Sequence, residues 1–432
     1  MDDEGPGSPP GIRPPGVLAR LRPHLLDVTP LRISSDLRRL VLAQSISEFG
    51  NQATLVAIPF QVYARTGSTV AVGLVALAEL IPNLALAPIG GSIADTVDRR
   101  RLTLVANAAF AVLSVGLAAN ALLPDPSVWP LYVFASVAGG VSALSVASVR
   151  AWPARLVPSE LLPAAFAIEG ASYNANALVG PAIAGLLIQI AGVASAYLLD
   201  LATFLVVIGL VAGMNPSRPS RSGEALASIR EGFHIVRTRR VIATILGLDF
   251  TAMFFGMPLA LLPALAAELG VGPAGLGLLY ATPALGGLMI AGLSGAAGKA
   301  RRPGWGVLLA LVGWSAGIVV TGFANVAWLA GFGLAVAGAG NELSALLGTA
   351  ITQSVVDDQI RGRVAGIDHL VSSAGPALGD VESGIVASWI GVSQTIALGG
   401  ALAFVGIAVL GAVGRQLRRY SFHSAQAAPA LE

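Results

Sequence analysis

The chain consists largely of long apolar runs, separated by short segments that carry charge, proline or glycine. A helix of about 20 apolar residues crosses the hydrocarbon core of a bilayer. Only 12% of the 432 residues are charged, about half of what a soluble domain carries. We therefore predict an all-α membrane protein. Hydropathy predicts twelve transmembrane helices, at residues 40–63, 70–93, 102–123, 128–149, 164–191, 194–214, 241–267, 273–297, 305–324, 327–354, 364–390 and 393–413.

The basic residues between these spans predict the orientation of the chain. With a cytoplasmic N-terminus, 25 of the 26 Lys and Arg residues fall on the cytoplasmic side, and Arg65 alone falls outside. The first 38 residues lack the apolar core of a signal peptide, and we expect a surface helix near Leu18–Leu26. The predicted parts are a cytoplasmic tail (1–38), a six-helix bundle (39–214), a cytoplasmic central loop (215–240), a second bundle (241–414) and a cytoplasmic tail (415–432).

The two halves of the chain carry related patterns. At an offset of 199 residues, Glu169 aligns with Asp368 and Gly185 aligns with Gly384. At an offset of 201, Arg100 aligns with Arg301. Each half has an even number of spans, so both begin on the same side of the membrane and the repeats are parallel. We expect two six-helix bundles related by an axis along the membrane normal, with a central cavity between them.

The composition excludes several kinds of site. Without cysteine the chain has no disulfide, thiolate metal site or cysteine nucleophile. The four histidines lie far apart in the sequence, so we predict no metal site. There is no phosphate-binding loop of the G-x-x-x-x-G-K-[ST] type and no soluble segment large enough for a catalytic domain. We expect neither an enzyme nor a cofactor, and the basic loops do not indicate nucleic-acid binding.

The loop after the second span reads GSIADTVDRRR at residues 91–101. Here the chain resembles the major facilitator superfamily, whose corresponding loop reads G-x-x-x-D-R-x-G-R-R. Thr96 and Asp98 replace the usual Arg and Gly of that motif. The resemblance implies the major facilitator fold and a cytoplasmic latch that closes this side in the outward-open state; a simple basic anchor is the alternative. Four positions match the motif and form the predicted latch: Gly91, Asp95, Arg99 and Arg100.

Further segments narrow the resemblance. Residues 180–185 read GPAIAG and resemble the G-P-x-x-G-G motif of antiporters in the fifth helix, with matches at Gly180, Pro181 and Gly185. The stretches 58–63, 123–127, 262–266 and 362–366 resemble the bacterial subfamily of enterobactin exporters and macrolide efflux proteins. The resemblance implies export of a siderophore or a drug from the bacterial cell, through the plasma membrane.

Carboxylic acids within or near the spans are the main chemical feature, because no span contains Lys or Arg. Such acids must be neutral, face a watery cavity or bind a cation. Burial favours the neutral acid, which suits a reversible proton carrier. The nine acids are Glu48, Glu79, Glu169, Asp200, Asp249, Glu342, Asp368, Asp380 and Glu382. Helices 1, 4, 7 and 10 line the cavity in the superfamily, which favours Glu48, Asp249 and Glu342; the repeat adds Asp368 and Glu169 as proton-coupling candidates.

Aromatic and amide groups are the candidates for the substrate surface, since apolar walls with a few polar groups suit an amphipathic organic ligand. They are Asn51, Gln52, Gln61, Tyr173, Asn174, Phe254, Tyr280 and Asn341. The prediction is a proton-coupled antiporter that exports a small organic molecule by alternating access and functions as a monomer. A proton symporter for uptake of a neutral or cationic solute is the alternative.

Overall fold

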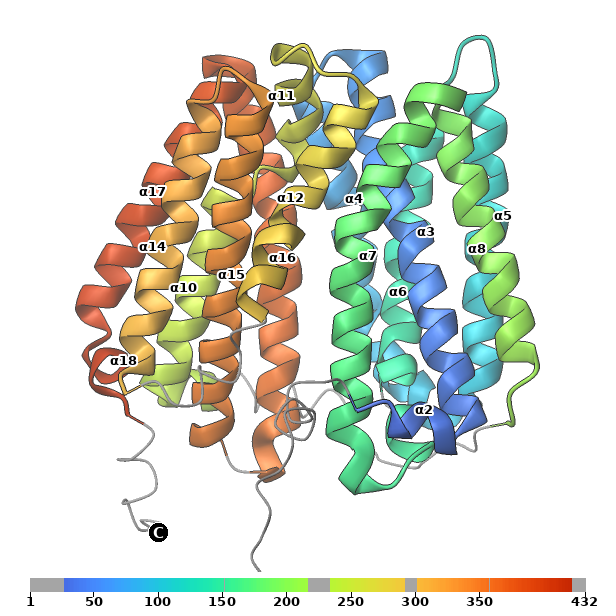
Figure 1. The fold of residues 1–432 in the computed structure, drawn as a ribbon, viewed down its shortest axis with the longest axis horizontal. Helices are drawn as coiled ribbons and strands as arrows, with labels where there is room; N and C mark the ends of the chain where they lie inside the picture. Colours follow the sequence, from blue (N-terminus) through green and yellow to red (C-terminus); the bar gives the residue numbers. More distant parts are fainter. Residues whose placement is uncertain (1–26, 151, 217–233, 292–300, 357, 422–432) are drawn as a thin grey trace, which may run out of the picture.

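The computed structural model describes residues 27–150, 152–216, 234–291, 301–356 and 358–421, and these ranges contain helices and no strand. The first half, coloured blue to green in Figure 1, forms one bundle beside the second half, coloured yellow to red. Its helices are α2 (Thr29–Ile33), α3 (Ser35–Thr66), α4 (Thr69–Thr96), α5 (Arg99–Ala121), α6 (Trp129–Arg150), α7 (Leu162–Ala191) and α8 (Val193–Ala212). Two short 3-10 turns, Pro153–Arg155 and Ser159–Leu161, lead from α6 to α7.

The second half repeats the pattern with one interruption. Its helices are α10 (Arg240–Gly256), α11 (Leu262–Glu268), α12 (Pro273–Ala291), α14 (Pro303–Gly322), α15 (Ala327–Val355), α16 (Asp358–Ile390), α17 (Val392–Val413) and α18 (Arg415–Arg419), with a 3-10 turn at Leu259–Leu261. The short helices α2 and α18 lie at the same end of the molecule, which we call the tail end; the opposite end is the far end (Figure 1).

The all-α membrane fold predicted from hydropathy is confirmed. Within the described residues, nine helical segments are long and apolar enough to cross a membrane. Three further long helices, α3, α6 and α16, supply the remaining passes, so the fold is consistent with twelve. The predicted surface helix near Leu18–Leu26 and most of the central loop fall outside the described residues.

The predicted span 241–267 matches the segment Arg240–Glu268, which is long and apolar enough to cross a membrane, but this segment is not one continuous helix. Helix α10 ends at Gly256, and Met257 adopts an extended conformation with φ −113° and ψ 93°. Pro258 follows, and proline both lacks an N–H for the helical ladder and forces the preceding residue out of the helical region. The backbone therefore breaks within the bundle and resumes as α11, which leaves peptide groups there to be bonded by other helices.

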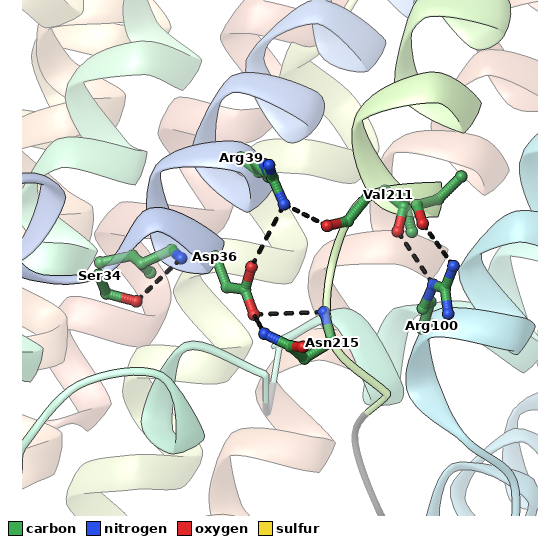
Figure 2. A network of polar contacts seen from close by, with 9 residues as sticks. Ser34, Asp36, Arg39, Arg100, Val211 and Asn215 are labelled. Atoms are coloured by element: carbon green, nitrogen blue, oxygen red, sulfur yellow. Dashed lines mark hydrogen bonds and ion pairs between the residues drawn. The ribbon is translucent and has the colours of Figure 1, made fainter.

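Two helix starts at the tail end of the first half, those of α3 and α5, are capped by side chains. Ser34 Oγ accepts from Leu37 N at 3.1 Å, and Asp98 Oδ1 accepts from Arg101 N at 3.0 Å. Asp98, which replaces the glycine of the superfamily loop, thus serves as the N-cap of α5. Figure 2 shows how α3 and the end of α8 are tied at this end: Asp36 bonds Asn215 Nδ2 at 2.9 Å, and Arg39 donates to Gly213 O.

A buried carboxyl group links three helices inside the first bundle. Asp200 of α8 has no solvent exposure. Its Oδ2 accepts from Thr54 Oγ1 of α3 and from Ser114 Oγ of α5, each at 2.9 Å. Gly50 of α3 lets this contact form, because a Cβ there would lie 2.7 Å from Asp200 Oδ1. These bonds hold α3, α5 and α8 together as one unit.

The two bundles meet through glycines in helices α7 and α12 and in helices α4 and α16. A Cβ on Gly185 of α7 would lie 2.4 Å from Pro273 O of α12, and a Cβ on Gly73 of α4 would lie 2.4 Å from Asp380 O of α16. Thr69 Oγ1 donates to Gly384 O at 2.8 Å. These residues belong to the far-end parts of their helices, where α12 leans against α7 in Figure 1. Backbone therefore contacts backbone between the halves at the far end.

Candidate functional site

A cavity of about 440 Å³ lies between the bundles and is lined by both. The first half supplies most of its wall, from helices α3 to α8, including the aromatic residues Phe110, Phe134, Tyr173 and Phe204. The second half adds Leu259, Ala260, Tyr280 and Asp380. Among the described residues the lining contains three carboxylic acids, Glu48, Glu79 and Asp380, and no Lys or Arg. The described lining is thus rich in aromatic and apolar residues, and its ionisable groups are these acids and tyrosines.

Glu48 is part of a polar strip of α3 that lines the cavity. Its Oε1 accepts from Gln52 Nε2 at 2.7 Å, and positions four apart share one face of a helix. Asn51 and Gln52 also line the cavity. Tyr173 of α7 lies within electrostatic range of Glu48 and of Glu342 from the other bundle. The predicted residues Glu48, Asn51, Gln52 and Tyr173 therefore occupy one wall.

Asp380 lies where the helix break of the second half reaches the cavity. Its Oδ1 accepts from Ala260 N at 3.0 Å, a peptide N–H that the broken helix leaves without a helical partner. Tyr280 Oη donates to Leu259 O at 2.9 Å in the same turn. The backbone carbonyl of Asp380 also faces Gly73 of α4. This acid is thus joined to the break of its own bundle and contacts the other bundle.

Two further hollows each belong to one bundle and carry acids that are related by the repeat. In the first half, Glu48 and Glu169 line a hollow of about 430 Å³. Within the described part of the chain, Glu169 Oε1 is buried and has no hydrogen-bond partner. In the second half, Asp249, Asp368 and Asn341 line a hollow of about 390 Å³. The structure therefore places four of the five proton-coupling candidates at hollows, in two separate groups.

Other predicted residues are not brought to these hollows. Gln61 is 4% exposed and accepts from Tyr197 Oη at 2.7 Å inside the first bundle. Phe254 stacks on Phe250 with ring centroids 5.6 Å apart. Asn174 and Glu342 line none of the three hollows described above, although Glu342 lies against Gly287 of α12. Of the nine acids, Glu79 and Asp380 line the central cavity, although neither was among the predicted proton-coupling candidates. Hydropathy identifies a membrane helix but does not show which side of that helix faces the cavity.

The residues of the predicted latch lie at the end of α4 and the start of α5. Gly91 and Asp95 lie in α4, and the side chain of Asp95 is outside the described part of the structure. Arg99 is 5% exposed, and Arg100 donates to Val211 O at 3.2 Å and to Ala212 O at the end of α8 (Figure 2). Arg100 therefore bonds within its own bundle in this conformation, and the latch stays a prediction.

The antiporter motif forms packing contacts on two sides of α7. A Cβ on Gly180 would lie 2.5 Å from Gln52 Cβ of α3, within the same bundle. Gly185 contacts α12 of the other bundle, where a Cβ on Gly277 would lie 2.3 Å from Pro181 O. Close approach of this kind is the usual role of small residues between membrane helices. The motif thus connects the polar wall of the cavity to the contact between the bundles.

Comparison with known proteins agrees with this architecture. The sequence profile of a family described as transmembrane secretion effector matches residues 27–428. The enterobactin exporter EntS of Citrobacter koseri is 30% identical over 400 residues, which cover 92% of this chain and 96% of that protein. EntS of Escherichia coli O81 gives the same identity and coverage. The match extends over both bundles and the segment between them.

Solved transporters share the fold at low sequence identity. The nucleoside transporter NupG superposes with a TM-score of 0.70 at 11% identity and covers 89% of this chain and 100% of that one. A bacterial homologue of the lysosomal transporter Spinster, in an inward-facing and unoccupied conformation, gives 0.67 at 14% identity, covering 91% and 96%. At these identities the likeness concerns the fold alone.

Proposed function

Because the chain belongs to the transmembrane secretion effector family of the major facilitator superfamily, we propose that it is a proton-coupled exporter of a small organic molecule. It works in a bacterial plasma membrane with both ends of the chain in the cytoplasm. The positive-inside rule supports this orientation, since the arginines of the loops gather at the tail end. The far end then faces outward, and the glycine contacts between the bundles close it.

One observation carries the proposal: the cavity between the bundles holds three acids and no basic residue in its described lining. An ionised carboxylate in a membrane interior is costly without a cationic partner. Such a cavity binds protons and a cationic or neutral cargo in turn. Glu48 and Asp380 lie on different bundles, so a change in their protonation alters contacts on both sides of the cavity.

The walls indicate the kind of cargo. Aromatic and apolar residues dominate the lining, and the amides of Asn51 and Gln52 are the hydrogen-bonding groups beside Glu48. An amphipathic molecule with aromatic rings fits these groups. A siderophore or a drug is the proposed class, in agreement with the exporters that the chain resembles. An iron-free catechol siderophore suits an acid-lined cavity because phenolic hydroxyls, with a pKa near 10, carry no charge at neutral pH.

The proposal is tested by transport into inverted membrane vesicles under an imposed pH gradient, with a panel of dyes, macrolides and iron-free catechols. Glu48→Gln and Asp380→Asn are compared with wild type. Glu382→Gln is the matched control, since Glu382 shares α16 with Asp380 but does not line the central cavity. We expect gradient-driven uptake that the control retains and at least one cavity variant loses.

Each other outcome points elsewhere. If both cavity variants keep gradient-driven uptake, the proton site lies at another acid: Glu79 of the same cavity, Glu169, Glu342, or the hollow of Asp249 and Asp368. If no compound accumulates in inverted vesicles but one accumulates in right-side-out vesicles with a proton gradient, the protein is an uptake symporter. Absence of any dependence on the gradient refutes proton coupling.

A further inference from the structure

A basic hollow of about 500 Å³ lies at the tail end of the second bundle, away from the central cavity. Its wall is formed by the start of α14, by α18 and by the residues beside them. Trp305 supplies an aromatic side to it. Five arginines surround it: Arg301, Arg302, Arg415, Arg418 and Arg419.

The hollow is held in shape by apolar and polar contacts of α18. Leu417 is fully buried, and its carbonyl lies against Gly304, where a Cβ would come within 1.9 Å. Tyr420 Oη and Ser354 Oγ are 2.6 Å apart, which joins the end of α18 to α15. Arg418 donates to Ala412 O at 2.9 Å. The arginines therefore project from a fixed frame rather than from a loose tail.

The positive charge of this hollow is not neutralised within the described part of the chain. None of the five arginines forms an ion pair there, and Arg418 Nε is buried without a hydrogen-bond partner. Arg100 of the first bundle, which aligns with Arg301 in the internal repeat, instead donates to the last carbonyls of α8. Several guanidinium groups around one hollow repel one another unless an anion joins them, and phosphate oxygens match their geometry.

Exposed apolar side chains continue from the hollow toward the middle of the membrane. Leu309 lies one turn after Trp305 on α14 and is 64% exposed. On α17, Val409 and Val413 are 56% and 77% exposed, and α18 follows directly. Positions four apart share one face of a helix, so Leu309 continues the face of Trp305 away from the hollow, and Val409 and Val413 form an exposed apolar strip on the neighbouring helix α17. We propose that this hollow binds the phosphate headgroup of an anionic phospholipid, with the acyl chains along these strips.

The test is binding of phosphatidylglycerol and phosphatidylcholine to the full-length protein in detergent, measured by native mass spectrometry. The test variant is Arg302→Gln with Arg415→Gln. The matched control is Arg32→Gln with Arg38→Gln, two exposed arginines at the same end but outside the hollow. Each arginine near an anionic lipid strengthens binding about fivefold, so the test variant should bind phosphatidylglycerol about 25-fold more weakly. The control should bind as wild type does.

Further arms make the result decisive. The charge-conserving variant Arg302→Lys with Arg415→Lys should keep part of the affinity, which separates loss of charge from loss of folding. Equal binding of the two lipids by wild type, or equal losses in the test and control variants, would overturn the proposal. Soluble glycerol phosphate that displaces phosphatidylglycerol at a similar concentration would assign the hollow to a soluble phosphate instead of a lipid.

Discussion

Substitution Gly185→Ala tests whether backbone contact between α7 and α12 sets the conformation of the transporter. The added Cβ would lie 2.4 Å from Pro273 O and 2.9 Å from Gly277 Cα. Both are backbone atoms, so no side-chain rotation relieves the contact, and the helices must separate by roughly 1 Å to restore a normal distance. We therefore expect the far end to open more often.

The size of the effect follows from the cost of overpacking, about 1–3 kcal/mol for an extra methyl group in a close contact. That range shifts a conformational equilibrium by about 5- to 150-fold. The higher helix propensity of alanine, about 1 kcal/mol over glycine, acts on α7 in both conformations and cancels. The population with an open far end should rise accordingly, and turnover should fall because the closed state is reached less often.

The assay uses the absence of cysteine from the sequence. Spin labels are attached at Leu123→Cys and Phe323→Cys, one exposed far-end site on each bundle, and report the separation of the bundles. No native thiol has to be removed first. Gly209→Ala is the control, since a Cβ there meets nothing within 4 Å. A distance distribution in Gly185→Ala that equals those of wild type and of the control would refute the reasoning.

Substitutions at three other positions test contacts outside the interface between the bundles. Asp200→Ala leaves the buried hydroxyl of Ser114 without its acceptor, so we expect a loss of about 1–3 kcal/mol in thermal unfolding, while Asp200→Asn should lose less because its amide oxygen still accepts. Arg100→Gln removes the guanidinium from the last carbonyls of α8 and should raise hydrogen exchange there, with α17 as the internal reference. Asp125→Asn breaks an exposed ion pair with Arg65 and should leave the unfolding temperature unchanged; a clear drop would contradict the low value given to surface pairs.

The helices were predictable because hydropathy measures the property that decides insertion into a bilayer. The span predicted at 164–191 compares with α7 at Leu162–Ala191, and the span 327–354 with α15 at Ala327–Val355. The break after Gly256 was missed, since hydropathy remains high through it. Pro258 was the available signal there, and it required attention to backbone geometry rather than to polarity.

The cavity was only partly predictable, because its lining depends on which face each helix turns to the other bundle. Glu48 was predicted because the first helix lines the cavity in the superfamily that the chain resembles, and Gln52 was predicted as an amide of the same helix; the structure joins the two by a hydrogen bond. Gln61 lies on the same helix but bonds to Tyr197 inside the bundle, and nothing in the sequence distinguishes the two amides. Asp380 gained its position from the break at Ala260, which itself was not foreseen.

The closure at the far end has a consequence for how sharply the protein changes state. Contacts between glycine backbones act through dispersion, and a gap of 0.5–1 Å already forfeits a quarter to a half of that attraction. Separation of α7 from α12 beyond such a gap therefore retains little stabilisation, while the few polar links between the described helices, such as that from Thr69 to Gly384, exchange readily with water. Because these contacts act only at short range, the two bundles favour a closed and an open arrangement over partly open ones. Partly open states, through which solutes could leak, are therefore disfavoured.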